Sequence, residues 1–140
     1  MYTILVIDDD IQILRLCKAF LEREGHTAFQ ATTGDAGIRV CDNKPIDLVI
    51  TDIIMPDKDG LETISEIRAR FPEIRIVAMS GGGRLGPDNY LPLAKKFGAV
   101  RVLSKPFTRD ELLAVVNDPV WEKRRSAKSV PIPSAQETSS

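Results

Sequence analysis

The sequence predicts an α/β fold built on a doubly wound, five-stranded parallel sheet with the strand order 2-1-3-4-5. Five short apolar runs recur along the chain, and segments with helical spacing of apolar residues lie between them. Strict alternation of strands and helices is typical of a parallel sheet covered by helices on both faces. Right-handed crossovers leave few possible topologies, and for five strands we expect the order 2-1-3-4-5.

Short runs that are rich in Ile and Val and bounded by turn residues indicate strands. We expect the five strands to be TILVI (3–7), TAFQA (27–31), DLVIT (47–51), IRIVAMS (74–80) and AVRVLS (99–104). In this strand order a ligand site lies beyond the carboxyl ends of the strands, at the switch point between the first and third. The polar residues at these ends are therefore the candidates for function.

The first helix shows a single apolar face, in which four side chains recur at spacings of three and four residues. We expect this face to pack against the sheet, and its members are Ile13, Leu16, Cys17 and Phe20. Gly25 predicts the end of the helix, because glycine commonly follows the last helical turn.

Two further helices begin with capping-box patterns, in which a short polar residue precedes a glutamate by three positions. The pairs are Asp59 with Glu62 and Thr108 with Glu111. The first of these helices is expected to stop at Pro72, because proline does not continue a helix. Weaker apolar patterns indicate two more helices, at 33–42 and 88–97.

The strand and helix patterns end at Asp118, so we expect one domain over residues 1–120 and a flexible C-terminal tail over 121–140. The tail is rich in Pro, Ser and charged residues, which do not form a core of their own. Trp121 is expected to pack the chain end rather than bind a ligand. A basic cluster is interpreted as solvated, with docking to an anionic surface as the alternative. It comprises Lys123, Arg124, Arg125 and Lys128.

The composition is that of an ordinary globular protein. With a formal net charge of -1, the 140-residue chain has no overall field that would attract nucleic acid or a membrane surface. No apolar run reaches the about 18 residues of a membrane-spanning helix, and the N-terminal segment lacks a signal-peptide pattern. Cys17 and Cys41 are isolated, which indicates reduced, packed cysteines. We therefore expect a cytoplasmic protein without direct nucleic-acid or membrane contacts.

Charged and hydroxyl residues stand at the carboxyl ends of four predicted strands. They are Asp8-Asp9-Asp10, Asp52, Ser80 and Ser104-Lys105-Pro106. Three carboxylates held about 5 Å apart repel by roughly 3 kcal/mol per pair at an effective dielectric of about 20. Lys105 offsets part of this repulsion, and a divalent cation would offset more. Because Mg2+ prefers all-oxygen ligation, Asp8, Asp9 and Asp52 predict a magnesium site. Asp10 is interpreted as the N-cap of the first helix.

A carboxylate at the end of a buried strand also predicts nucleophilic chemistry. An aspartate can attack a phosphoryl group and form an acyl phosphate. This transfer needs in-line geometry and neutralisation of the equatorial phosphoryl oxygens, which Mg2+, Lys105 and the Ser80 hydroxyl would supply. We therefore interpret Asp52 as the nucleophile.

With these residues the chain closely resembles the receiver domain of two-component response regulators. The resemblance covers residues 3 to about 117 and depends on four motifs in combination. These are the acidic pair after the first strand, D-x-x-M-P-x-x-D-G at 52–60, the hydroxyl residue that ends the fourth strand, and K-P-F at 105–107. It implies a flavodoxin-like receiver fold in a phosphoacceptor module.

The resemblance implies that Asp52 accepts the phosphoryl group from a phosphohistidine of a sensor histidine kinase or a phosphotransfer protein. It implies that Asp9 and Asp52 bind Mg2+ directly and that Asp8 acts through water. The backbone carbonyl of Ile54 would be the further protein ligand.

The resemblance also implies how the phosphoryl group is held. Ser80 would bind a phosphoryl oxygen, Lys105 would pair with the phosphate, and the Lys105–Pro106 peptide bond would be cis. The protein would be a stand-alone, chemotaxis-type receiver. It would not be an enzyme beyond catalysing its own phosphorylation and dephosphorylation.

One position departs from the family pattern. The family usually has an aromatic residue three positions before the lysine, and this chain has Val102. A long glycine-rich loop, SGGGRLGPDN, also follows the fourth strand at 80–89. We therefore expect signalling through ordering of residues 80–90 rather than through an aromatic flip. A downstream effector protein would read the face formed by 88–97, 99–104 and 108–118.

Three other functions remain as alternatives. Gly81, Gly83 and Gly86 spell G-x-G-x-x-G, which suggests a nucleotide-binding protein, but the pattern does not lie on the first strand–helix turn. A haloacid-dehalogenase-type phosphatase needs a second aspartate where Ile54 stands. A receiver-like domain that is never phosphorylated would not need the full acidic set. His26, the only histidine, is interpreted as structural or solvent-exposed rather than as a relay group.

Overall fold

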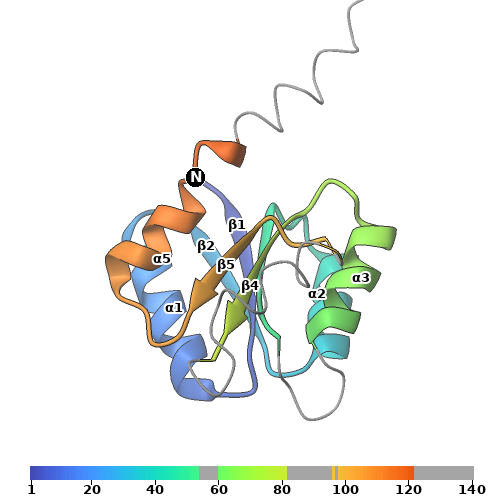
Figure 1. The fold of residues 1–140 in the computed structure, drawn as a ribbon, viewed down its shortest axis with the longest axis horizontal. Coiled ribbons are helices and arrows are strands. Elements are labelled where there is room, and N and C mark those ends of the chain that lie inside the picture. The colour runs from blue at the N-terminus through green and yellow to red at the C-terminus, as the bar shows by residue number, and fades with distance from the viewer. Residues whose placement is uncertain (54–59, 82–95, 97, 122–140) are drawn as a thin grey trace, which may run out of the picture.

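The computed structural model describes residues 1–53, 60–81, 96 and 98–121. Within them, five parallel strands form one sheet in the predicted order β2-β1-β3-β4-β5 (Figure 1). Their bounds are β1 Thr3–Ile7, β2 Thr27–Ala31, β3 Leu48–Asp52, β4 Arg75–Ser80 and β5 Arg101–Ser104. Because β1 and β3 are neighbours, their carboxyl ends meet at the switch point.

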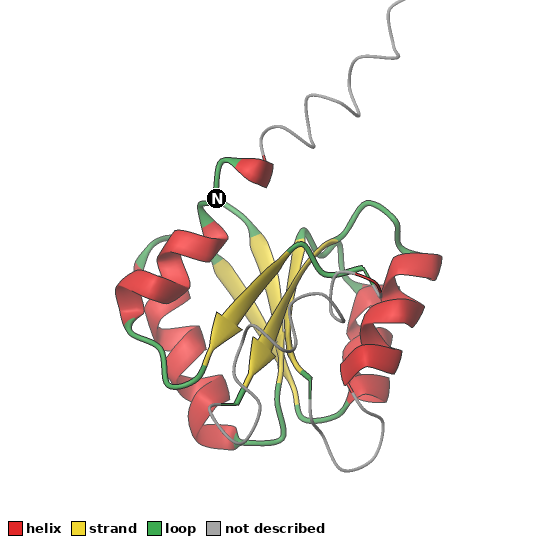
Figure 2. Cartoon of the chain, viewed as in Figure 1, coloured by secondary structure: helices red, strands yellow, loops and turns green. Residues whose placement is uncertain are grey.

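Helices cover both faces of this sheet and give the fold three layers (Figure 2). The described helices are α1 Ile11–Arg23, α2 Gly34–Asn43, α3 Gly60–Arg70 and α5 Arg109–Val116. α1 and α5 lie on one face, and α2 and α3 lie on the other (Figure 1). Most of the helix predicted at 88–97, and the predicted cap at Asp59, fall outside the described residues. In the described part of the chain, no helix has the length and apolar character needed to cross a membrane.

The central strands are apolar on both sides, which is typical of a parallel sheet buried between two helix layers. Leu5 and Ile7 of β1 pack beneath α2 and α3, whereas Ile4 and Val6 pack beneath α1 and α5. All four side chains are fully buried. The alternation follows from the two-residue period of a strand, and it explains why the strand patterns are recognisable in the sequence.

The observed strands agree with the predicted ones to within two residues at each end. β3 continues one residue beyond the prediction and includes Asp52, which pairs with Met79 of β4. β5 begins at Arg101 instead of residue 99, because its ladder with β4 starts at the pair Val77–Arg101. The backbone of Asp52 is therefore held by the sheet itself.

The buried face of α1 differs from the predicted one. Its buried residues are Leu14, Cys17 and Leu21. The side chain of Leu16 is 40% exposed, and Ile13 and Phe20 are only partly buried. Both sets satisfy helical spacing and share Cys17, so periodicity alone does not decide between them. The rotation of α1 about its own axis, which its packing on the sheet sets, decides which residues are buried.

The helix ends follow local sequence signals. Asp10 accepts a hydrogen bond from the backbone N–H of Gln12 at 2.9 Å, which confirms its role as the N-cap of α1. Gly25 follows the C-cap with a φ of +92°, a conformation that favours glycine. Thr108 and Glu111 form the complete capping box of α5, with hydrogen bonds of 3.1 and 2.8 Å.

The chain end packs more tightly than its composition indicates. Trp121 is fully buried, and its Nε1–H donates to the carbonyl of Val115 at 2.8 Å. Asp118 accepts from the Val120 N–H at 2.9 Å and pairs with Arg101 at 2.7 Å. Trp121 therefore packs as predicted, and it belongs to the domain core although the predicted boundary placed it in the tail. The basic cluster of the tail lies outside the described residues.

The single histidine has a structural role, as one of the two predicted alternatives stated. His26 is 8% exposed, its Nδ1 accepts a hydrogen bond from the Tyr2 N–H at 3.0 Å, and the two rings stack. It is not solvent-exposed. Cys17 and Cys41 are free and buried, as expected.

Candidate functional site

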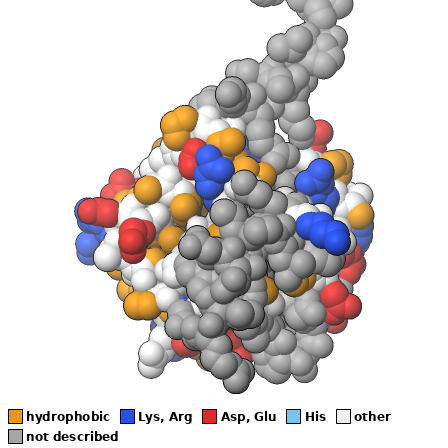
Figure 3. All heavy atoms as spheres, in the orientation of Figure 1, with side chains coloured by type: hydrophobic (Ala, Val, Ile, Leu, Met, Phe, Trp, Pro, Cys, Tyr) orange, Lys and Arg blue, Asp and Glu red, His pale blue; other side chains and the backbone are white. Residues whose placement is uncertain are grey.

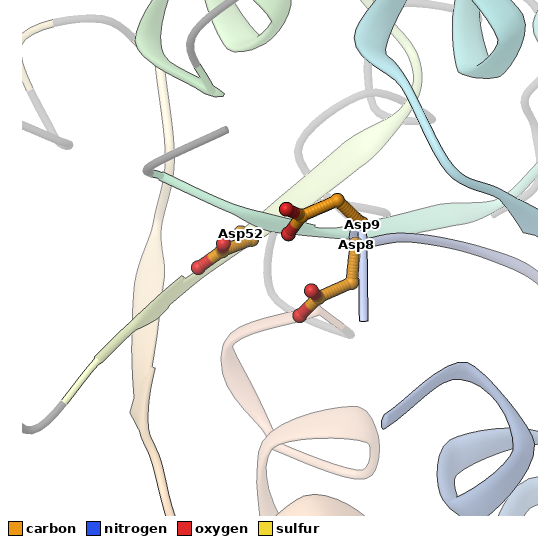
Figure 4. A group of neighbouring side chains, drawn as sticks. All are labelled: Asp8, Asp9 and Asp52. Carbon is orange, nitrogen blue, oxygen red and sulfur yellow. The ribbon is translucent and has the colours of Figure 1, made fainter. Parts of the chain in front are cut away.

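Three aspartates from the ends of β1 and β3 converge at the switch point. Carboxylate oxygens of Asp8, Asp9 and Asp52 lie within 4.8 Å of one another (Figure 4). Asp8 is fully buried and Asp52 is 6% exposed, whereas Asp9 is open to solvent. The cluster forms because Ile7 of β1 and Thr51 of β3 are register partners, so the residues that follow them are adjacent.

Backbone hydrogen bonds fix the position of Asp8. Its N–H donates to the carbonyl of Ala31 at 3.1 Å, and its Oδ1 accepts from the Asp10 N–H at 2.9 Å. The other carboxylate oxygen, Oδ2, is left to face the site. The chain therefore turns from β1 into α1 with the Asp8 carboxylate pointing inward.

A close backbone approach holds the end of β3. The Ile53 N–H donates to the Met79 carbonyl at 3.0 Å, and the Gly60 N–H donates to the Ile53 carbonyl at 2.7 Å. A Cβ atom at Gly60 would lie 2.0 Å from the backbone oxygen of Asp52, so only glycine fits. Gly60 therefore positions Asp52, a role that the sequence analysis did not assign, although this glycine ends the 52–60 motif.

Lys105 reaches the acids from the end of β5. Its N–H donates to the Ser80 carbonyl at 2.8 Å, which keeps the ends of β4 and β5 together. Its Nζ lies 2.7 Å from Asp8 Oδ2 and 3.4 Å from Asp52 Oδ1. The Lys105–Pro106 bond is cis, as the family resemblance implied.

Ser80 supplies a buried hydroxyl at the end of β4, next to the backbone of Lys105. The residue is fully buried, and its Oγ has no hydrogen-bond partner among the described residues. An unpaired buried hydroxyl costs free energy, about 1 to 3 kcal/mol. The hydroxyl is therefore available to a ligand oxygen at the end of β4.

The pKa values of Asp52 and Lys105 are both raised above their ordinary values. Burial raises the pKa of Asp52 to about 6, with Asp8 and Asp9 adding to the rise and Lys105 opposing it. Burial disfavours the charge of Lys105, but its hydrogen bond to Asp8 and the charges of Asp52 and Asp8 outweigh that effect and raise its pKa. The lysine is therefore charged, and it balances only part of the acidic charge.

The residues present fit a divalent cation. Three carboxylates and one ammonium group leave two negative charges uncompensated in a partly buried space. All the candidate ligand atoms are hard oxygens, which suit Mg2+ better than softer metals. The predicted fourth ligand, the Ile54 carbonyl, lies outside the described residues.

The structure brings together five of the six predicted site residues, which are Asp8, Asp9, Asp52, Ser80 and Lys105. Val102 is partly buried and packs against the core beneath α2 and α3. Of the glycine-rich segment 80–89, the structure describes Ser80 and Gly81. On the face shown in Figure 3, Lys and Arg side chains lie among Asp and Glu side chains over the described helices.

Comparisons with known proteins agree with this geometry. The family model described as "Response regulator receiver domain" matches residues 4–117. The chain is 41% identical over 120 residues to the DNA-binding transcriptional regulator NtrC of Azospirillum brasilense, covering 81% of this chain and 23% of that protein. It spans less than half the length of this and other curated regulators that it matches.

Solved structures show the same fold. A response regulator receiver domain protein from Clostridium thermocellum superposes with a TM-score of 0.77 at 33% identity, covering 91% of this chain and 99% of that one. NtrX from Brucella abortus in complex with ADP gives a TM-score of 0.83 at 30% identity, covering 93% of this chain and 29% of that one. Because the curated relatives are longer regulators, the predicted stand-alone form stays a prediction.

The fold, the acidic switch point and these matches show that the chain belongs to the receiver domain family of response regulators, the phosphoacceptor modules of two-component systems.

Proposed function

We propose that Asp52 accepts a phosphoryl group from a phosphohistidine of a sensor histidine kinase or a phosphotransfer protein. The observation that carries this proposal is the position of Asp52 at the end of β3, with a lysine ammonium 3.4 Å from its carboxylate. A carboxyl with a pKa of about 6 is largely ionised at neutral pH and can act as a nucleophile.

The proposed step conserves charge and atoms. A carboxylate oxygen of Asp52 attacks phosphorus in line with the bond that breaks. The new O–P bond forms while the P–N bond to the donor imidazole breaks, and its electron pair stays on the imidazole nitrogen. The product is an acyl phosphate on Asp52.

The acidic cluster supports a role for Mg2+. Asp9 and Asp52 would hold the ion directly and Asp8 through water. When bound, the ion supplies charge neutralisation for phosphoryl oxygens. Its presence would also relieve the repulsion among the three carboxylates, which lie within 4.8 Å of one another.

Two side chains act on the phosphoryl group itself. Lys105 would move part of its pairing from Asp8 and Asp52 to a phosphoryl oxygen. Ser80 would donate its otherwise unpaired hydroxyl to another. Ser80 ends β4 and Lys105 follows β5, and these two strands are neighbours in the sheet. A phosphoryl group on Asp52 would therefore act on the ends of β4 and β5.

The wider role follows from this chemistry. The protein would catalyse only its own phosphorylation and dephosphorylation, in the cytoplasm, and would pass the signal to a downstream effector. Since Val102 is β-branched and packed against the core, an aromatic flip at this position is not available. Ordering of residues 80–90 remains the proposed switch, although most of that segment lies outside the described residues.

Incubation with acetyl phosphate and Mg2+, followed by intact mass measurement, tests the acceptor. The full chain should gain one phosphoryl group, and Asp52→Asn should gain none. Asp10→Asn is the matched control, because it removes a neighbouring charge while an asparagine keeps the N-cap of α1. Undiminished phosphorylation of Asp52→Asn would show that another residue is the acceptor.

Hydrogen exchange with and without a phosphate mimic and Mg2+ tests the switch. Added protection across 81–92 is expected, with little change at Val102. Protection gained only elsewhere would contradict the switch but leave the acceptor assignment intact.

A further inference from the structure

β2 forms one edge of the sheet. It pairs with β1 along its whole length, and no other described strand pairs with it. The Thr27 N–H donates to the Tyr2 carbonyl at 3.0 Å, and the Ala31 carbonyl accepts from the Asp8 N–H at 3.1 Å. Backbone groups alternate in direction along a strand. Ala28 and Gln30 therefore direct their N–H and C=O groups away from β1, toward the open edge.

Within β2, none of the features that commonly prevent an edge strand from pairing with another chain is present. Natural edge strands are commonly blocked by charged residues, proline or bulges. The sequence of β2 is Thr-Ala-Phe-Gln-Ala, without any of these, and its register with β1 is continuous. Its five residues offer room for a short extended segment.

Two cavities flank the same edge. One, of about 440 Å3, lies at the carboxyl end of β2, between α1 and the first turn of α2, and includes Ile11, Gln30 and Ala36 in its wall. The other, of about 330 Å3, lies between β2 and α2 and includes Phe29 and Val40. Both are open to solvent and form shallow grooves beside the strand rather than enclosed pockets. Figure 1 shows α1 and α2 on opposite sides of the sheet.

An extended segment that paired with β2 would place its side chains alternately on the two faces of the sheet. Successive side chains of an extended segment point to opposite faces of a sheet. Phe29 lines the second cavity and the next residue, Gln30, lines the first, so two neighbouring residues of a segment bound to β2 would point toward different cavities. The first cavity has Ile11 and Leu14 in its wall beside polar residues, and the second has Phe29 and Val40, so each offers an apolar patch to an aliphatic side chain.

The charged residues that line the two cavities have one sign. Arg15 lines the first cavity, and Arg39 and Lys44 line the second, while no Asp or Glu is among the described residues that line either. The Lys44 Nζ lies 5.7 Å from the centre of the Phe29 ring, which places this charge over the edge strand. The groove is therefore cationic in a protein whose formal net charge is -1.

We propose that the β2 edge binds an extended, acidic segment of a partner protein, which adds to the sheet as a sixth strand. Backbone hydrogen bonds to Ala28 and Gln30 would give affinity, as in other cases of strand addition. Two adjacent aliphatic residues in the cavities would fix the register. Flanking carboxylates would pair with Arg15, Arg39 and Lys44. A second copy of this chain would bring identical cations together, so it is a poorer occupant.

A titration of the ¹⁵N-labelled full chain, followed by NMR, tests this proposal. The probe is the peptide acetyl-Glu-Glu-Val-Val-Glu-Glu-amide, and the comparison is acetyl-Lys-Lys-Val-Val-Lys-Lys-amide. The amide signals of Ala28 and Gln30 should shift with the acidic peptide, which should bind at least tenfold more tightly than the basic one. Methylation of both valine nitrogens should abolish binding, because it removes the donor that faces β2 without altering the protein.

Variants of the protein separate this groove from general charge effects. The double variant Arg39→Glu with Lys44→Glu should weaken binding of the acidic peptide at least tenfold. Lys18→Glu is the matched control, since Lys18 is an exposed cation on α1 outside the groove, and it should change affinity less than twofold. Equal binding of both peptides, shifts confined to other elements, or self-association of the chain through β2 without peptide would each overturn the proposal.

Discussion

The ammonium group of Lys105 and the carboxylate of Asp8 form an ion pair at 2.7 Å, with Asp8 fully buried. Asp8 follows β1 and Lys105 follows β5, and because the strands are all parallel both residues lie at the carboxyl end of the sheet. The pair holds the acidic cluster together without cancelling its charge.

Lys105→Met is expected to destabilise the protein by about 2 to 3 kcal/mol in EDTA. Removal of one partner of a buried pair typically costs about 3 to 5 kcal/mol, and the 20% exposure of the lysine side chain reduces this. The same substitution should cost at least about 1 kcal/mol less in an Asp8→Asn background, because the 2.7 Å pair is gone and only the 3.4 Å pairing with Asp52 is left to lose. Urea unfolding measures this cycle. Equal costs in both backgrounds would show that the pair contributes nothing.

The free energy of unfolding of the metal-free protein should depend on pH through the titration of Asp52. Its folded-state pKa of about 6 is above the ordinary value of 3.8. The protonated carboxyl therefore favours folding, and this contribution is present in full below about pH 4 and is lost as the pH rises through 6. The excess stability of Asp52→Asn over the parent chain should accordingly grow between pH 4 and 7. Parallel pH profiles for the two proteins in EDTA would contradict the assignment.

Mg2+ should raise the melting temperature of the parent chain. An ion that binds only the folded state adds about 2.7 kcal/mol of stability at 100 times its Kd. Asp9→Asn should be more stable than the parent in EDTA, because one repulsive charge is removed, and it should lose the Mg2+ effect. Ca2+-free and Mg2+-free thermal scans provide the baseline. A melting temperature that does not respond to Mg2+ would mean that the acids do not form a metal site.

Gly60→Ala should destabilise the protein by about 2 to 3 kcal/mol and slow phosphorylation of Asp52. The added methyl would lie 2.0 Å from the Asp52 carbonyl and 2.5 Å from the Ile53 Cα, so the backbone at the end of β3 has to move. Gly81→Ala is the control, because a Cβ at Gly81 meets no atom of the described residues within 4 Å. Similar effects of both substitutions on stability and phosphorylation would argue against a positioning role for Gly60.

Trp121→Ala should cost about 3 to 5 kcal/mol, the range for removal of a large buried aromatic side chain. Trp121→Phe should cost less, since it keeps most of the apolar contact and loses only the hydrogen bond to Val115. Urea unfolding followed by circular dichroism compares the three proteins, because the parent has a single tryptophan and fluorescence is lost in both variants. If Trp121→Ala unfolds at the same urea concentration as the parent, the chain end is not part of the core.

Local signals explain why so much of the fold and site was predictable. The strands follow from runs such as TILVI, and the caps at Asp10 and Thr108 involve hydrogen bonds that span two or three residues. The acids and the lysine were predicted to meet because each one stands at or just beyond the carboxyl end of a strand, and parallel strands end on the same side of the sheet.

The sequence by itself determined which residues form strands, where helices begin, and which polar side chains stand at the strand ends, because each depends on neighbours a few residues away. Only the tertiary structure decided that Leu14 and Leu21, not Leu16, face the sheet, because helical spacing leaves the rotation of α1 open. It also decided that Trp121 fills the core and that Gly60 lies against the Asp52 carbonyl. These features depend on contacts between distant segments, and such contacts exist only once the helices have packed on the sheet.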